Sequence, residues 1–155
     1  MGYQIDQSGK IEQTNKDTIL CLANGSWDAV IVKAKTKRQV QEIFRRNGQI
    51  RNYILFTFSI LLATLLKRNK NLGQVLVDTE YMGKDAIIKN ITLEVLTNLK
   101  SIPDINFGFV GKLSPAHDKA AKISHNKLKA KYEINSLKIL KALKKTEVGK
   151  QLKDT

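Results

Sequence analysis

The pattern of hydrophobic and polar positions predicts a group of strands at the start of the chain. Residues 2–6, 18–25 and 27–35 are short runs that are rich in β-branched and apolar residues. The dipeptide Asn24-Gly25 separates the second run from the third, and it is a strong signal for a tight hairpin. The three runs therefore predict three strands arranged as a meander.

From residue 36 to residue 70 the period of the pattern changes. Apolar residues recur at steps of three and four, which predicts helix with a break near Asn47-Gly48. Within this stretch, residues 53–66 (YILFTFSILLATLL) are apolar on most sides. A run of this length falls short of the ~20 residues that a membrane span needs. We therefore expect a core helix that is buried against the sheet, and no membrane partner.

The second half of the chain alternates strands with helices. We expect a strand at 73–81, a helix at 82–100, a strand at 105–112 and a helix at 114–131 that has Ser114 as its N-cap. The order of elements is then β-β-β-α-β-α-β-α. This order predicts an α/β fold in which one mixed sheet of five strands is flanked by helices.

The length and the lysine content suggest how the chain is organised. A chain of 155 residues fits one domain, which we place at residues 1–131. Residues 132–155 are rich in lysine and are predicted to form an amphipathic C-terminal helix or a tail. The sequence does not indicate an oligomeric state.

The charge of the chain bears on its partners. The net charge is +13, with 27 basic and 14 acidic residues. This excess favours nucleic acid as a partner, because neutralising phosphates releases counterions. The alternative is that the lysines form solvated faces without a partner. Aromatic residues make up only 6% of the chain, which favours recognition of backbone or duplex shape over base stacking. The candidate nucleic-acid-binding residues are Lys10, Arg38, Arg45, Arg46, Lys112 and Lys119.

The cysteine content and the first residues bear on localisation. Cys21 is the single cysteine, so no internal disulfide can form, which is typical of a reducing compartment. The first ten residues, MGYQIDQSGK, contain neither the basic region nor the apolar stretch of a signal peptide. We therefore expect a cytoplasmic protein.

Four acidic residues fall where predicted strands end or a predicted helix begins. Asp6 ends the first strand, Asp78 ends the fourth, and Glu80 shares the face of Asp78 if that strand continues. Asp118 falls in the first turn of the helix at 114–131. If the first and fourth strands are parallel neighbours, these carboxylates meet at one edge of the sheet. Their repulsion then favours bound Mg²⁺ or Mn²⁺, and two such ions about 4 Å apart promote phosphodiester hydrolysis.

Each of these residues also has a simpler interpretation. Asp6 can be a turn residue, and Asp78 can be a turn residue or a helix N-cap. Asp118 can stabilise the start of its helix through the helix dipole. His117 can orient water or transfer a proton during hydrolysis, or it can be a plain surface histidine.

Three short segments, together with the predicted three-strand meander and the long helix, resemble the ribonuclease H-like superfamily of nucleases and resolvases. YQIDQSG is similar to its first strand with the aspartate, VLVDTEY to the acidic end of its fourth strand, and FVGKLSPAHDKAAK to its closing strand and helix. The resemblance spans roughly residues 3–125. It implies an Mg²⁺-dependent nuclease with Asp6, Asp78 and Asp118 as metal ligands. Ribonuclease H proper has a further glutamate on a helix, for which either Glu42 or Glu80 is the candidate here.

The predicted function is therefore a divalent-metal-dependent nuclease that hydrolyses phosphodiester bonds in RNA–DNA hybrid, duplex or branched nucleic acid. The alternative is a protein of the same fold that has lost catalysis and only binds nucleic acid. The candidate catalytic residues are Asp6, Asp78, Glu80, Asp118 and His117.

Overall fold

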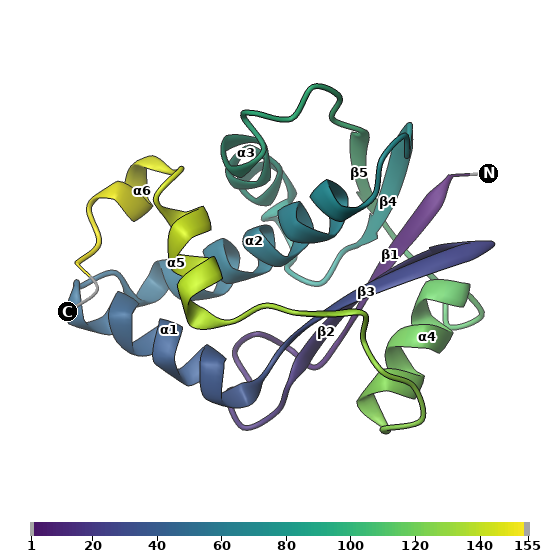
Figure 1. The fold of residues 1–155 in the computed structure, drawn as a ribbon, viewed down its shortest axis with the longest axis horizontal. Coiled ribbons are helices and arrows are strands. Elements are labelled where there is room, and N and C mark those ends of the chain that lie inside the picture. Colours follow the sequence, from purple (N-terminus) through teal and green to yellow (C-terminus); the bar gives the residue numbers. More distant parts are fainter. Residues whose placement is uncertain (1, 154–155) are drawn as a thin grey trace.

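A mixed sheet forms the centre of the protein (Figure 1). The computed structural model describes residues 2–153. The sheet has six strands in the spatial order β5-β4-β1-β2-β3-β6. Their bounds are β1 Tyr3–Ser8, β2 Thr18–Asn24, β3 Ser26–Val32, β4 Gln74–Asp78, β5 Asp104–Gly108 and β6 Tyr132–Glu133. β1, β2 and β3 form the antiparallel meander, whereas β4 is parallel to β1, β5 to β4 and β6 to β3.

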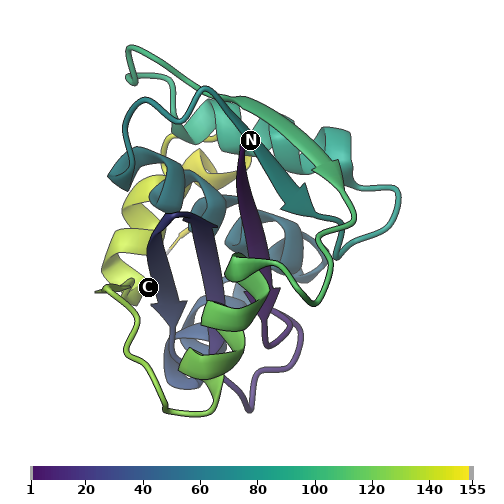
Figure 2. The ribbon, with the colours of Figure 1, turned by 90° about the vertical axis from the view of Figure 1, so that its right-hand side faces the viewer.

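The helices form two layers, one on each face of the sheet. Their bounds are α1 Ala34–Arg46, the short 3₁₀ helix η1 Ile50–Asn52, α2 Tyr53–Arg68, α3 Asp85–Val95, α4 Pro115–Ser124, α5 Ser136–Leu143 and α6 Glu147–Lys150. α4 packs on β1 and β2 from one side, and α2 packs on β2 and β3 from the other (Figure 2). The expected break between the first two helices occurs at Gly48, whose φ of 67° ends α1. An α/β fold with a mixed sheet and flanking helices is confirmed.

The alternation of side chains along the strands separates two parts of the core. Ile5, Leu20 and Val30 belong to the main core under α2, while Cys21 and Ala29 pack with residues of α4. α2 is buried on most sides, and each of its large side chains contributes about 1.5–3 kcal/mol through burial. The stretch Ile50–Arg68 has the length and apolar composition of a membrane span, but most of it lies inside the protein.

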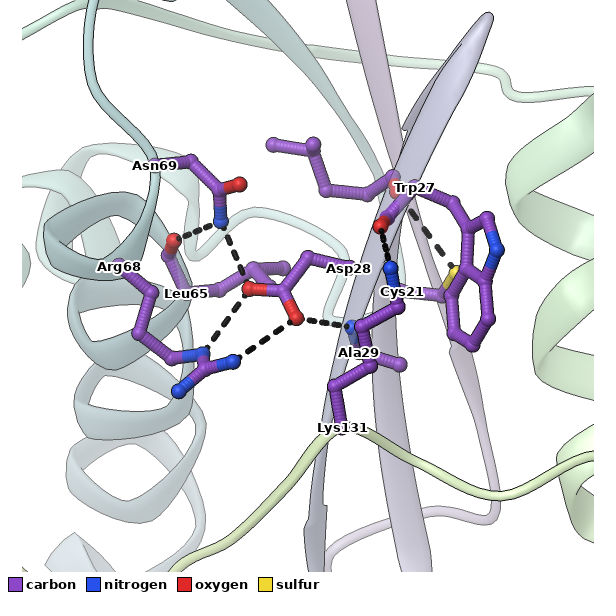
Figure 3. A network of polar contacts seen from close by, with 9 residues as sticks. Cys21, Trp27, Asp28, Ala29, Leu65, Arg68, Asn69 and Lys131 are labelled. Atoms are coloured by element: carbon purple, nitrogen blue, oxygen red, sulfur yellow. Dashed lines mark hydrogen bonds and ion pairs between the residues drawn. The ribbon is translucent and has the colours of Figure 1, made fainter.

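One buried carboxylate ties β3 to the end of α2. Asp28 accepts hydrogen bonds from Arg68 Nε at 2.9 Å and from Asn69 Nδ2 at 2.8 Å, as Figure 3 shows. It also accepts one from the backbone N–H of Ala29 at 3.0 Å. Burial by itself would raise the pKa of Asp28, but the hydrogen bonds and charge of its partners outweigh burial and lower the pKa. The pair therefore holds together two elements that are 40 residues apart in sequence.

A buried lysine holds the loop between β1 and β2. The Nζ of Lys37 on α1 donates to the carbonyl oxygens of Lys10 and Gln13 and to the Thr18 hydroxyl, at 3.0, 2.7 and 2.9 Å. The three ammonium protons therefore each have an acceptor. Burial lowers the pKa of Lys37 to about 8. This lysine fixes the loop that directly follows Asp6 and β1.

The C-terminal segment packs into the same core as the rest of the chain. Residues 132–133 form the sixth strand, which the sequence analysis did not predict, and α5 and α6 follow it. Ile134, Ile139, Leu143 and Leu152 are buried in the main core. The predicted helix is therefore present, and it is integrated into the α2 layer.

Candidate metal centre

Two carboxylates lie side by side on β1 and β4: Asp78 ends β4, as expected, whereas Asp6 lies within β1, which continues to Ser8 through its pairing with β2. These strands are parallel neighbours, and Ile5 is paired with Val77. The next residue on each strand is an aspartate, Asp6 and Asp78. Because Ile5 and Val77 both point into the main core, the alternation along each strand directs the two aspartates toward the opposite face, where α4 lies.

Glu80 joins the two aspartates. β4 ends at Asp78, but the backbone N–H of Thr79 still donates to the carbonyl of Gly108 at 2.9 Å. The extended backbone therefore continues by one residue, and Glu80 returns to the face of Asp78. Carboxylate oxygens of Asp6, Asp78 and Glu80 all lie within 4.8 Å of one another. Of the two glutamates that the sequence offered as a fourth acid, the structure brings Glu80 to the aspartates.

Burial and the crowding of negative charge raise the pKa of two carboxyl groups in the site. Burial raises the pKa of Glu80 to about 7, and a hydrogen bond with Asp78 and the charges of Asp78 and Asp6 add to the rise. The charge of Lys10 acts in the opposite direction. Burial also raises the pKa of Asp6, and hydrogen bonds from His117 and the Gln7 backbone offset that rise only in part.

Neighbouring groups orient the two aspartates. Oδ1 of Asp78 accepts a hydrogen bond from the backbone N–H of Val110 at 2.8 Å. Oδ1 of Asp6 accepts one from the backbone N–H of Gln7 at 2.9 Å. Oδ2 of Asp6 lies 2.7 Å from Nδ1 of His117. Since an ionised carboxylate only accepts hydrogen bonds, Nδ1 of His117 is then the donor, and Nε2 is the ring nitrogen that does not contact Asp6.

The start of α4 places His117 in the site. Ser114 is the N-cap, as the sequence predicted, and its hydroxyl accepts a hydrogen bond from the backbone N–H of Ala116. Ala116, Ala120 and Ile123 are the buried residues of the helix. His117 lies at the flank of this buried face, and its ring reaches Asp6 on β1, one of the two strands on which α4 packs.

Asp118 and Glu42 lie outside the group of three carboxylates. Oδ2 of Asp118 forms an ion pair at 3.1 Å with Lys122, one turn further along α4, and the Asp118 side chain is 53% exposed. Glu42 pairs with Arg45 and Arg46 on the exposed side of α1. The sequence predicted Asp118 as a third metal ligand, but the structure does not bring Asp118 to Asp6 and Asp78. His117, its neighbour, contacts Asp6 instead.

The candidate nucleic-acid-binding residues occupy different surroundings. The charge of Lys10 acts on Glu80, so this lysine lies near the carboxylates. Lys112 is exposed in the segment before α4. Arg38 donates to the carbonyl of Thr14, and Lys119 lies over the Trp27 ring at 5.7 Å. Arg45 and Arg46 are engaged by Glu42 on α1.

Tyr81 is a residue of this site that the sequence analysis missed. Its hydroxyl accepts a hydrogen bond from the backbone N–H of Ile11 at 3.3 Å and donates to Glu12 at 3.3 Å. Its ring packs edge-on against Phe58 of α2, with centroids 5.3 Å apart. Tyr81 therefore fixes the segment that carries Glu80 to the loop after β1. Its place directly after Glu80 is the one sequence signal that pointed to it.

A groove of about 830 Å³ lies on the α4 side of the sheet, toward the C-terminal end of α4. Asp6, Asp78 and Glu80 do not line it, and it approaches the site at Ser8, which is two residues beyond Asp6 on β1. We call it the α4 groove. Its floor is aliphatic, with Ile19, Ile31 and Ile123. Its polar lining includes Lys16, Lys33, Lys129 and His125, together with the acids Asp17 and Glu133.

The donor set fits a hard divalent cation. Three carboxylates supply oxygen ligands, which Mg²⁺ and Mn²⁺ prefer, and the described residues bring no cysteine or second histidine to the group. Burial raises the pKa of Asp6 and of Glu80, and the neighbouring carboxylates add to the rise, so a cation bound here would stabilise their charged forms. Comparison with protein-family models, curated proteins and solved structures gave no match to this chain.

Proposed function

We propose that the protein is a divalent-metal-dependent nuclease of the ribonuclease H-like type, which hydrolyses phosphodiester bonds in hybrid, duplex or branched nucleic acid. The observation that carries the proposal is the meeting of Asp6, Asp78 and Glu80 within 4.8 Å at two parallel neighbouring strands. Three carboxylates at this spacing repel one another, so a cation is the natural partner of the cluster.

The topology of the sheet supports the assignment to this superfamily. The resemblance in sequence lies in the first strand, the fourth strand and the closing strand and helix. In the structure β1, β4 and β5 are consecutive parallel neighbours, and the helix α4 returns to β1. Three of the segments that carry the resemblance therefore surround the carboxylates.

The residues of the chain have separate tasks in the proposed reaction. Asp6, Asp78 and Glu80 hold the cation, which supplies Lewis-acid stabilisation of the phosphate and lowers the pKa of water. The Val110 N–H fixes the orientation of Asp78. His117 orients Asp6 through Nδ1, and its Nε2 is available to accept or donate a proton at the edge of the site.

The surroundings favour nucleic acid as the substrate. The net charge is +13, and the α4 groove, which approaches the site at Ser8, is lined by three lysines and by the acids Asp17 and Glu133. Lysines along this groove can contact phosphates of the substrate beyond the cleaved bond, and phosphate contacts supply most of the sequence-independent affinity.

The substitution Asp78→Asn tests the proposal. Asn keeps an acceptor for the Val110 N–H, so the fold is preserved while one anionic ligand is lost. We expect cleavage of labelled hybrids, duplexes and four-way junctions in Mg²⁺ or Mn²⁺ to fall by more than the ~10–100-fold that a lost supporting contact costs. Binding of the same substrates should survive. The matched control is Asp104→Asn, an exposed aspartate at the opposite end of the neighbouring strand β5.

Two outcomes would contradict the proposal. If Asp78→Asn cleaves as fast as the wild type, these carboxylates do not carry the reaction. If the wild type binds the substrates but cleaves none of them with either metal ion, the alternative holds, and the protein is a nucleic-acid-binding member of the fold without catalysis.

A further inference from the structure

A second groove, of about 460 Å³, lies on the other side of the sheet between the end of α2 and α5. We call it the α5 groove. Five basic residues line it and no acidic residue does. Its aliphatic floor includes Ala63, Val95, Leu96 and Ile134. The basic residues are Lys67, Arg68, Lys138, Lys141 and Lys145.

Most of this positive charge is uncompensated within the protein. Arg68 is the exception, because it pairs with Asp28. Within residues 2–153, no ion pair involves Lys67, Lys138, Lys141 or Lys145. Like charges gathered around one groove repel one another, so an anion bound there relieves an unfavourable arrangement.

Helix dipoles account for only part of the cluster. Lys67 and Arg68 occupy the last turn of α2, and Lys141 the last turn of α5, where a cation is favourable. Lys138 instead lies in the first turn of α5, where the helix dipole disfavours a cation. It is held over the ring of Tyr132 at 4.5 Å, and Arg68 lies over the same ring at 4.7 Å.

Tyr132 therefore positions two cations at the mouth of the α5 groove. Lys138 and Lys141 are three residues apart on one side of α5, and Lys145 follows in the turn after the helix. A row of cations with this spacing matches the repeated phosphates of a nucleic acid backbone better than it matches a single small anion.

The two grooves are joined around one edge of the sheet. Lys129 lines the α4 groove and Tyr132 lines the α5 groove, only three residues apart in the segment that leads into β6. Between them Lys131 lies over the Trp27 ring at 4.2 Å. A basic path with Lys129 and Lys131 therefore leads from the α4 groove past the β3–β6 edge to the α5 groove, and the acid Glu133 lies at that edge.

We propose that the α5 groove binds the phosphate backbone of the nucleic acid segment that flanks the cleavage position. The proposal rests on the proposed function, since it names a second contact of the same substrate. A strand that leaves the α4 groove along the basic path would reach the α5 groove. Short substrates end before this contact, and long or branched ones make it.

The test compares Lys138→Gln/Lys141→Gln with the matched pair Lys84→Gln/Lys89→Gln. Both double variants remove two positive charges. In the control, Lys84 is the N-cap residue of α3 and Lys89 lies within that helix, and neither lines the α5 groove. Binding of labelled duplexes of ~10 and ~40 base pairs is measured by fluorescence anisotropy across a salt series, with thermal unfolding as a check on folding.

We expect the Lys138→Gln/Lys141→Gln variant to bind the long duplex about tenfold more weakly than the control variant does. Its slope of log affinity against log salt should be less negative by about 2, because two phosphate contacts are lost. Binding of the short duplex should match that of the control. Cleavage of the short duplex under single-turnover conditions should also be unchanged.

The failures of the two proposals are distinguishable. If the wild type binds and cleaves but both double variants bind the long duplex equally, the α5 groove proposal is wrong and the nuclease proposal stands. If inorganic phosphate or vesicles containing phosphatidylserine bind through Lys138 and Lys141 while the long duplex does not, the proposal is also overturned. If the wild type binds no nucleic acid, the proposed function itself fails.

Discussion

The raised pKa of Glu80 leads to a prediction about stability without any substrate. The ordinary pKa of a glutamate is 4.5, and burial together with Asp78 and Asp6 raises that of Glu80 to about 7 in the folded protein. The folded state therefore binds a proton more tightly than the unfolded state does. The contribution of Glu80 to stability is fully present below pH 4.5 and is lost as the pH rises through about 7, because the buried group must then ionise beside Asp78.

The size of the loss follows from the displacement of the pKa. At about 1.4 kcal/mol for each pKa unit, the full displacement corresponds to roughly 3 kcal/mol. Solvent reaches part of the site and screens its charges, so we expect about 2 kcal/mol to be realised. For a protein of this size, that corresponds to a difference of roughly 4–8 °C in the midpoint of thermal unfolding.

Thermal unfolding of the wild type and of Glu80→Gln, followed by circular dichroism at pH 5 and pH 8 in EDTA, measures this difference. The glutamine variant cannot ionise, so it should lose less stability between the two pH values by about 2 kcal/mol. Glu42→Gln, on the exposed side of α1, is the control and should follow the wild type. Addition of Mg²⁺ at pH 8 should restore stability to the wild type more than to Glu80→Gln. Parallel pH curves for the wild type and Glu80→Gln would refute the reasoning.

Three further substitutions test the parts of the fold that support the site. Asp28→Ala leaves Arg68 without its buried partner and should lower the free energy of unfolding by about 3–5 kcal/mol in urea denaturation. Lys37→Met keeps the volume but removes the donor from two carbonyl oxygens and from the buried Thr18 hydroxyl, and we expect a loss of about 1–3 kcal/mol; an unchanged midpoint would contradict the structural role of this lysine. Gly9→Ala should cost at least about 2 kcal/mol, since φ is +78° and a Cβ would lie 2.2 Å from the Asp17 carbonyl oxygen.

The long elements of the fold followed from the sequence, and the shortest one did not. Residues 18–24 and 26–32 form the predicted hairpin, and the helix that spans 36–70 breaks at Gly48 as expected. β6 has two residues, Tyr132 and Glu133, which is too short for any periodicity to appear. Its position is set by pairing with Val30 and Ile31, a contact over about 100 residues of sequence that local patterns do not encode.

At the site, the sequence located the strand ends but misjudged the rotation of one helix. Asp78 could be predicted because it follows the apolar residues of its strand, and Asp6 because it directly follows Ile5, although β1 continues past it to Ser8. At about 100° for each residue, Asp118 points almost opposite to the face formed by Ala116 and Ala120, whereas His117 lies at its flank. A helical wheel drawn on the alanines would therefore have favoured His117. The clustering of Asp6, Asp78 and Glu80 requires β1 and β4 to be parallel neighbours, and the sequence alone did not determine which strands are neighbours.

The two-residue strand β6 also covers part of an edge of the sheet to which a second copy of the protein could otherwise pair. Without it, β3 would be the edge of the sheet, and its N–H and C=O groups would be open to pairing with another chain. β6 occupies this edge at Val30 and Ile31, and the lysines around it discourage a second copy from adding a strand. A chain cut after residue 131 would therefore expose the unpaired edge of β3 and the apolar surface that Ile139 and Leu143 cover. We expect such a chain to aggregate instead of forming a smaller soluble domain.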